Sequence, residues 1–168
     1  MDKIIETIET HLERIPHGVF VDTIAAGVVD EMDGGYVNVM LGGLVKNMFQ
    51  YSVIGDVAGG CIQNMQGGTI DSVRKKGHII FARNQGCTIK LVTEGGVVDN
   101  VASGAVVNCV SHGGRVHTVH EGGIVVVMPG GIVDEVRNGG VVIAYTKLDG
   151  VALEGELATI IDRSDYFK

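Results

Sequence analysis

The feature that most constrains the fold is a short repeat that begins with glycine. Pairs of adjacent glycines recur along the chain, and apolar residues stand at the second and fifth positions after the second glycine, as in GGTIDSV at residues 67–73. About fifteen such units follow one another at a spacing of about eight to ten residues, some with weaker starts such as Ser52. The predicted inward pairs are Val37/Met40, Val45/Met48, Ile62/Met65, Ile70/Val73, Val98/Val101, Val107/Val110, Val116/Val119, Val125/Met128, Val133/Val136 and Val142/Tyr145.

This spacing favours strands over helices. A glycine in every unit, with valine and isoleucine between, destabilises a helix, whereas glycine at a corner accepts a positive φ without a clash. A strand of four or five residues is not stable alone, so the chain must coil and stack each unit on an equivalent one. The 26 glycines are accompanied by only 2 prolines, which excludes a collagen helix. The sequence therefore predicts an all-β fold, a parallel β-solenoid.

The distribution of glycine pairs suggests three units per turn. When the units are sorted by threes, the set that starts at residues 27, 52, 77, 105 and 131 mostly lacks the pair, and the other two sets mostly have it. We therefore expect a right-handed, three-faced parallel β-helix of about five turns, each made of three units. The alternative is a two-faced turn that closes after only two units.

The two ends of the chain differ from the repeat. Residues 1–16 read as an amphipathic helix that ends at Pro16, residues 17–150 as the solenoid, and residues 151–168 as a C-terminal cap. The helix would either plug the open end of the solenoid or make an oligomer contact. The residues of that contact would be Ile4, Ile8 and Leu12.

Two units depart from the pattern, and we expect a bulge at each. The unit at Ser52 reads as lacking its second apolar position, and the stretch from Gly86 to Glu94 carries one extra residue, so that Ile89 and Val92 replace the expected pair. A bulge can direct a loop toward a ligand.

Charge and cysteine content bear on partners and compartment. The net charge of −7 and the pI near 5.2 argue against nucleic-acid binding and against an anionic membrane surface. No stretch is long and apolar enough to span a bilayer, and glutamates interrupt the N-terminal segment where a secretory signal would need an apolar core. Three cysteines do not suggest a disulfide framework. We expect a cytoplasmic protein with reduced thiols.

Few residues point to chemistry. His112, His117 and His120 form a histidine-rich region that could hold zinc, although their spacing matches no standard site. Cys61 and Cys87 would stack in successive turns of a three-faced solenoid, close enough for a disulfide. No nucleophile triad, nucleotide loop or carboxylate pair is present, so we expect no catalytic residues and no cofactor.

The segments GGTIDSV (67–73) and GGVVDNV (95–101) carry a family resemblance. The region from Gly34 to Thr146 resembles the AIDA-type repeats of bacterial autotransporter adhesins, which implies a β-solenoid. The chain is also similar to bactofilins, which are cytoplasmic solenoids that polymerise end to end; that similarity implies self-assembly.

These observations favour a non-enzymatic binding or assembly protein of bacterial or phage origin. Its rigid surface would contact a protein partner, further copies of itself, or both, and no membrane. One alternative is a phage-encoded inhibitor of a host defence enzyme that acts by acidic surface mimicry. Another is a metal-dependent enzyme that uses the region of His112, His117 and His120. The acidic residues that recur at polar positions are Asp30, Asp71, Asp99, Asp134 and Glu135.

Overall fold

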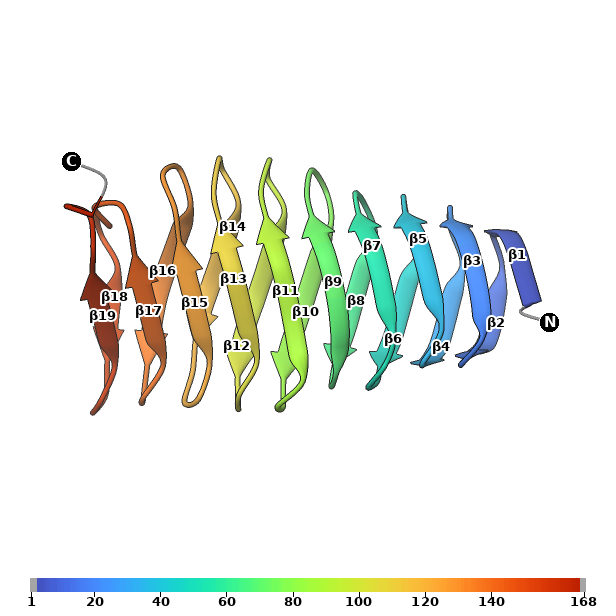
Figure 1. Cartoon of the computed structure of the whole chain (residues 1–168), viewed down its shortest axis with the longest axis horizontal. Helices are drawn as coiled ribbons and strands as arrows, with labels where there is room; N and C mark the ends of the chain where they lie inside the picture. Colours follow the sequence, from blue (N-terminus) through green and yellow to red (C-terminus); the bar gives the residue numbers. More distant parts are fainter. Residues whose placement is uncertain (1–2, 167–168) are drawn as a thin grey trace.

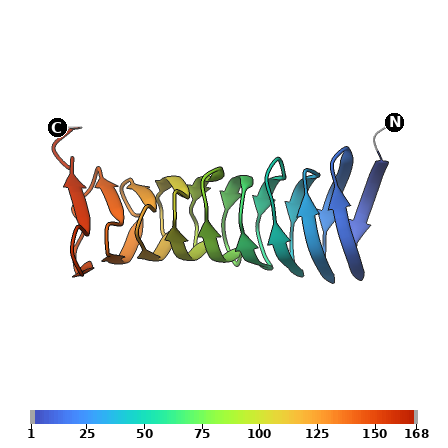
Figure 2. The same ribbon diagram turned by 90° about the horizontal axis from the view of Figure 1, so that it is seen from below.

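The chain forms a straight rod of stacked β-strands (Figures 1 and 2). The computed structural model describes residues 3–166, and these contain strands and turns but no helix. Odd-numbered strands form a ten-stranded parallel sheet. They are β1 (Lys3–Ile8), β3 (Val19–Ile24), β5 (Tyr36–Met40), β7 (Val53–Val57), β9 (Gly68–Val73), β11 (Cys87–Val92), β13 (Val106–Val110), β15 (Ile124–Val127), β17 (Val141–Ala144) and β19 (Thr159–Asp162).

Even-numbered strands form a second parallel sheet, with nine strands, on the other side of the core. They are β2 (His11–Pro16), β4 (Val28–Asp33), β6 (Leu44–Met48), β8 (Cys61–Met65), β10 (His78–Arg83), β12 (Val97–Ala102), β14 (Arg115–Val119), β16 (Ile132–Arg137) and β18 (Ala152–Glu154). Because every strand pairs only with strands two places away in the sequence, the chain crosses from one sheet to the other at each corner.

The solenoid therefore has two faces and about nine turns, and the prediction of three faces and five turns was wrong. In the ten-stranded sheet, Val37 pairs with Ile54, and Ile54 pairs with Ile70, so two units complete a turn here. The repeat alone does not distinguish the two arrangements, because such a short unit closes a turn equally well after two copies or three. The two-faced alternative is the correct one.

The predicted inward positions form the core. Nearly all of the paired apolar residues have no exposed surface, and they line up in columns between the two sheets. The prediction fails at two pairs, where Val127 and Ala144 are buried in place of Met128 and Tyr145. At the first of these, the register between β13 and β15 shifts and places Val110 opposite Val127. Strands β15 and β17 are thus one residue shorter on the inner face.

The predicted helix at residues 1–16 is absent from the described part, residues 3–16, which forms β1 and β2. Ile8 and Ile15 are buried, while Ile5 and Leu12 pack on the core less completely. The same isoleucine stripe that suits a helix also supplies the strand pattern of two apolar residues three apart. Stacking on β3 and β4 pairs the backbone of both strands along one edge, which decides in favour of strands.

The C-terminal segment continues the solenoid through the residues described. β18 pairs with β16, and β19 pairs with β17, so residues 151–162 form a last turn of the solenoid. Ile160 stands in the inner column next to Val142, and Leu153 is 58% exposed. Residues 167 and 168 of the predicted cap lie outside the described part of the chain.

The unit at Ser52 is regular, contrary to prediction. Ile54 and Val57 are both fully buried, so the second apolar position is present. Ser52 replaces the corner glycine: its hydroxyl donates to the Met32 carbonyl at 2.9 Å and accepts from the Gly34 amide at 2.9 Å. A buried hydroxyl with both bonds made ties this corner to the turn before it.

The unit after Gly86 places Ile89 and Val92 in the core as expected. Its strand, β11, pairs in continuous register with β9, without the expected bulge. The extra residue is absorbed in the turn that precedes the strand.

Candidate functional site

On the outer face of the nine-stranded sheet, imidazoles alternate with carboxylates along the rod. Nε2 of His78 lies 2.9 Å from Oδ1 of Asp99, and Nε2 of His117 lies 3.8 Å from the same oxygen. On the next turn, Nδ1 of His117 lies 2.5 Å from Oδ2 of Asp134. These four side chains come from β10, β12, β14 and β16. Each is partly exposed, so the row forms a solvated ladder rather than a pocket.

The three histidines predicted as metal candidates do not converge. His112 is exposed in the turn between β13 and β14, His117 lies in the middle of the sheet face, and His120 follows β14 at the other corner. Nε2 of His120 lies 3.0 Å from Oδ1 of Asn100. Within residues 3–166, no three His, Cys, Asp or Glu side chains are placed to hold one metal ion.

The two cysteines expected to stack lie in different sheets. Cys61 belongs to β8 and Cys87 to β11, because two faces replace three, and both are free thiols. Burial raises the pKa of Cys87 to about 11. Burial, with a smaller effect of Asp99, also raises the pKa of Cys61. Both thiols therefore stay protonated near neutral pH, which makes them poor nucleophiles and poor metal ligands.

The acidic residues that suggested mimicry are paired. Asp30 lies 2.7 Å from both Lys46 Nζ and His11 Nε2, and Asp71 lies 2.7 Å from Lys90 Nζ. The hydrogen bonds from Lys46 and His11 lower the pKa of Asp30. Glu135 and Glu154 pair with Arg137 at 2.9 and 2.8 Å in the same way. The carboxylates are thus balanced by neighbours on the next turn or the same strand.

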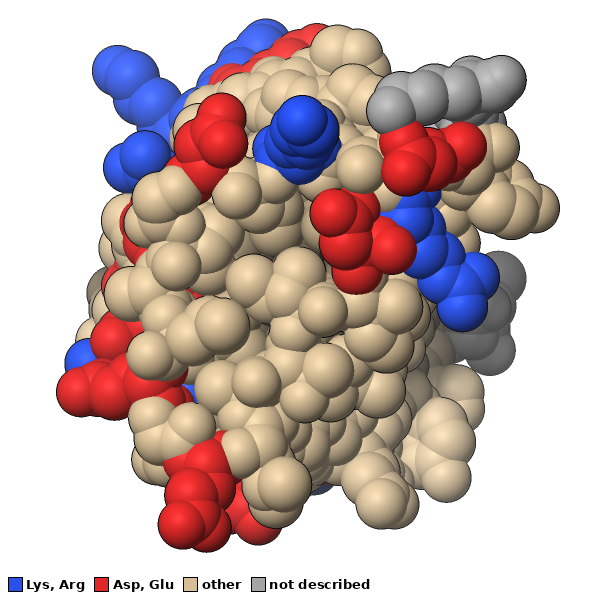
Figure 3. All heavy atoms as spheres, turned by 90° about the vertical axis from the view of Figure 1, so that its left-hand side faces the viewer, with Lys and Arg blue, Asp and Glu red and all other residues tan. Residues whose placement is uncertain are grey.

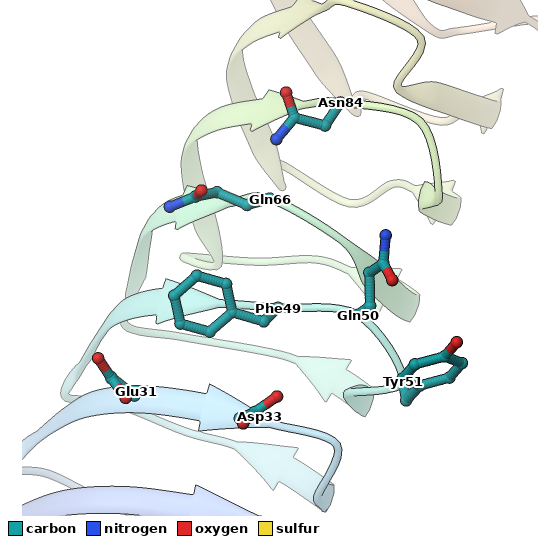
Figure 4. Close-up of a pocket in the computed structure, with 7 residues that line it drawn as sticks. All are labelled: Glu31, Asp33, Phe49, Gln50, Tyr51, Gln66 and Asn84. Atoms are coloured by element: carbon teal, nitrogen blue, oxygen red, sulfur yellow. The ribbon is translucent and has the colours of Figure 1, made fainter.

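A different region carries unpaired polar groups. Four surface hollows lie along one corner of the rod, the corner at which even-numbered strands lead into odd-numbered ones. We call this row the corner trough. Its largest hollow, of about 550 Å³, spans four turns (Figure 4). It is lined by Glu31, Asp33, Phe49, Gln50, Tyr51, Gln66 and Asn84.

Figure 4 shows how these residues are arranged. Phe49, Gln66 and Asn84 come from three successive turns, and Glu31 and Asp33 come from the turn before Phe49. From Phe49 the chain rounds the corner through Gln50 and Tyr51 to Ser52. The lining thus combines two aromatic rings, three side-chain amides and two carboxylates.

The local sequence explains this shape. Residues 49–52 read FQYS where several other corners carry a glycine pair, so larger side chains occupy the turn. Tyr51 adopts a φ of 64°, and its side chain is 82% exposed. This exposure follows from the next residue, Ser52, which is buried and anchors the chain at the corner. The stem of Gln50 lies against Gly67, whose missing Cβ leaves room for it: a Cβ there would stand 2.8 Å from the Gln50 stem.

The trough contains polar groups that make no bonds with the part of the chain that the structure describes. The side-chain amides of Gln50, Gln66 and Asn84 have no hydrogen-bond partner among residues 3–166, in contrast to the amides of Asn38 and Asn100 on the two sheet faces. Of the two carboxylates, Asp33 pairs with Arg14, and Glu31 is exposed. No Lys or Arg lines the largest hollow.

Sequence reasoning did not identify this site. The sequence marks the corner at Ser52 and the stretch from Gly86 as irregular, and both border the trough. The available signal was the absence of a glycine pair at the corner between β6 and β7, together with the aromatic residues that stand there.

The fold and the trough define a parallel β-solenoid with a surface groove at one corner. No protein-family model, no curated protein and no solved structure matches this chain. Among residues 3–166, no helix is long and apolar enough to cross a membrane.

Proposed function

We propose that the chain is a non-enzymatic binding or assembly protein of bacterial or phage origin, working in the cytoplasm. It would present a rigid solenoid to a macromolecular partner. The coil would be right-handed, because parallel crossover connections almost always are. The observation that carries this proposal is the contrast between the two kinds of surface. Polar side chains on the sheet faces largely bond to each other, whereas the amides of Gln50, Gln66 and Asn84 in the corner trough are unpaired among residues 3–166 and lie beside the rings of Phe49 and Tyr51.

The trough suits an extended partner rather than a small substrate. It follows the long axis of the rod across several turns and is open to solvent, whereas a catalytic pocket encloses its ligand and excludes water. The surface is also preorganised: the lining residues stand on turns fixed by continuous parallel pairing. A rigid surface loses little entropy on binding, which favours affinity.

The test is capture of a partner by immobilised protein from bacterial lysate. We expect wild type and a Lys75→Ala/Lys76→Ala control at the opposite corner to retain the same component. A Phe49→Ala/Tyr51→Ala variant should lose it while keeping the circular dichroism spectrum of the wild type. Equal retention by the trough variant and the wild type would contradict binding at this corner.

Self-association is a second candidate, favoured by an apolar patch on the outer face of the ten-stranded sheet. Here β13 to β19 present Val106, Ile124, Val126, Val141, Ile143 and Ile161, with no charged side chain at the neighbouring outer positions of β13, β15 and β17. At the C-terminal end of the rod, Leu153 in β18 of the other sheet is also exposed, and the lower middle of that end carries few charged side chains (Figure 3). A second copy is the occupant expected, because a chain of net charge −7 repels itself except at a face free of charge.

Sedimentation velocity tests this second candidate. Wild type and a Thr69→Lys control, at the same strand position as Val141 but farther along the sheet, should associate as concentration rises, whereas Val141→Lys should remain monomeric. A monomer at all concentrations for wild type would contradict self-association. Neither outcome bears on partner binding at the trough, which the lysate capture tests separately.

The other two hypotheses find less support. Acidic mimicry requires carboxylates that are free to bind a basic partner, and those of Asp30, Asp71 and Asp134 are each paired with a cationic or imidazole group. A metal-dependent reaction at His112, His117 and His120 requires them to meet at one point, and they lie at two corners and on a sheet face.

A further inference from the structure

We propose that the corner trough binds a neutral glycan chain that lies along the axis of the rod. This inference rests on the proposed binding function and names the partner class. It uses three features of the trough: aromatic rings, unpaired amides at turn spacing, and the absence of lysine and arginine from the lining of its largest hollow.

The aromatic rings supply the apolar part of the contact. Tyr51 is 82% exposed and held in a left-handed backbone conformation, and Phe49 is half-buried in the same turn. An exposed ring costs free energy in water unless something covers it. The C–H faces of a pyranose are flat, weakly apolar and of matching size, so they cover such a ring while their hydroxyls stay at the edge.

The amides supply the polar part. An amide offers both a donor and an acceptor, and this pair matches the two adjacent hydroxyls of a sugar ring. Gln66 and Asn84 stand on successive turns next to the turn of Gln50, and the turn spacing in a parallel sheet is about 4.8 Å. One sugar unit of an extended glycan covers a similar length. A repeating polymer can therefore place equivalent hydroxyls against successive turns.

Charge selects among polymers. The largest hollow contains Glu31 and Asp33 and no cationic side chain, so a nucleic acid or another polyanion would meet repulsion. The exposed Glu31 can accept hydrogen bonds from hydroxyls. Its single unpaired carboxylate is a weak basis for recognising a polycation, and Asp33 is already paired with Arg14. These properties favour an uncharged, hydroxyl-rich ligand.

The opposite corner lacks this combination. Its turns carry Lys75, Lys76, Glu94 and His112, which are charged or ionisable, together with glycine pairs. Backbone bonds join several of these turns directly, as between the amide of Glu94 and the carbonyl of His112 at 3.0 Å. The chain therefore provides an internal control surface on the same rod.

The experiment is affinity electrophoresis of the full chain in native gels that contain soluble neutral polysaccharides. The panel comprises α- and β-linked polymers of glucose, mannose, galactose and N-acetylglucosamine, with dextran sulfate as an anionic and chitosan as a cationic comparison. We expect at least one neutral polymer to slow migration. Tyr51→Ala and Gln66→Ala should each weaken the apparent affinity about tenfold, on the order of one stacking or bidentate contact. Lys75→Ala should leave it unchanged.

Three outcomes would overturn the glycan proposal: no retardation by any neutral polymer, retardation by a charged polymer alone, or neutral binding that Tyr51→Ala and Gln66→Ala leave intact. The lysate experiment distinguishes failure of the glycan proposal from failure of the proposed partner-binding function. A captured component that trypsin destroys and that Phe49→Ala/Tyr51→Ala abolishes would identify a protein at the trough, and would preserve partner binding while refuting the glycan.

Discussion

Arg74 holds Asp56 through three hydrogen bonds that join two turns of the solenoid. Nε of Arg74 lies 3.0 and 2.9 Å from the two carboxylate oxygens, and Nη2 donates to Oδ2 at 2.6 Å. Ser72 adds a fourth bond, from its hydroxyl to Oδ1 at 2.6 Å. Burial opposes ionisation of Asp56, but the bonds from Arg74 and Ser72 outweigh it, so the pKa of Asp56 lies below its usual value.

This pairing predicts an acid-sensitive contribution to stability. A carboxyl group with a lowered pKa in the folded state stabilises it above the unfolded pKa, and the contribution is lost as pH falls through the folded pKa. Asp56→Asn should lower the free energy of unfolding by about 1–2 kcal/mol at pH 7, since Arg74 is partly exposed, and by much less near pH 2. Urea denaturation at both pH values measures this. Asp71→Asn, which breaks the exposed pair with Lys90, is the control, and a loss as large there would refute the special role of Asp56.

Cys87 predicts the opposite pH dependence. Its Sγ lies 2.9 Å from the Arg83 carbonyl and 3.1 Å from that of Met65, and burial raises its pKa to about 11. The folded state therefore favours the protonated thiol, and this contribution is complete below the unfolded pKa near 9 and is lost as pH rises toward 11. Between pH 8 and 11, wild type should lose about 2 kcal/mol more stability than Cys87→Ala, which has no thiol to ionise. Parallel losses in the two proteins would show that the thiol does not contribute.

The inner columns of this fold were predictable because their periodicity reports burial directly. Ile62/Met65 and Ile70/Val73 are predicted inward from spacing alone, and both pairs are fully buried. The number of faces was not predictable in the same way, because it depends on which units stack, and every unit presents the same pair of apolar residues. The units that mostly lack the glycine pair, at residues 27, 52, 77, 105 and 131, alternate between the two sheets, so the pairs do not report the face.

The N-terminal segment shows a second limit. Spacings such as Ile5 to Ile8 and Leu12 to Ile15 satisfy a helix and a solenoid strand alike. Backbone pairing with β3 and β4 decides between them, and such pairing is a property of neighbours rather than of local sequence. The trough was not predicted, for a related reason. Phe49, Gln66 and Asn84 belong to three different turns, so their proximity can be inferred only once the number of residues per turn is known.

A glycine pair has two separate roles, which a matched pair of variants can distinguish. Gly113 adopts a φ of 83°, and a Cβ there would meet only open space and one backbone nitrogen at 3.9 Å. Gly114 lacks a positive φ, but a Cβ there would stand 2.1 Å from the Val92 carbonyl oxygen of the preceding turn. Gly113→Ala should therefore cost about 1 kcal/mol of backbone strain, and Gly114→Ala about 3 kcal/mol because two turns must separate. Thermal denaturation of both variants measures the order, and a larger loss for Gly113→Ala would refute this division of roles.

The register shift between β13 and β15 gives the sharpest test of the architecture. Regular spacing after Val125 would bury Met128, whereas the structure buries Val127 completely and leaves Met128 at the surface of the turn. An unpaired carboxylate in the core cannot be hydrated, so Val127→Asp should cost roughly 4 kcal/mol or more, as uncompensated buried charges do, and should unfold the C-terminal turns. Met128→Asp should cost about 1 kcal/mol, because its carboxylate reaches water. Hydrogen exchange at the amides of β13 to β17 provides the measurement, with rapid exchange expected in Val127→Asp alone. If these amides stayed protected from exchange in Val127→Asp but exchanged rapidly in Met128→Asp, Met128 would be the buried residue. That result would support regular spacing and refute the register shift.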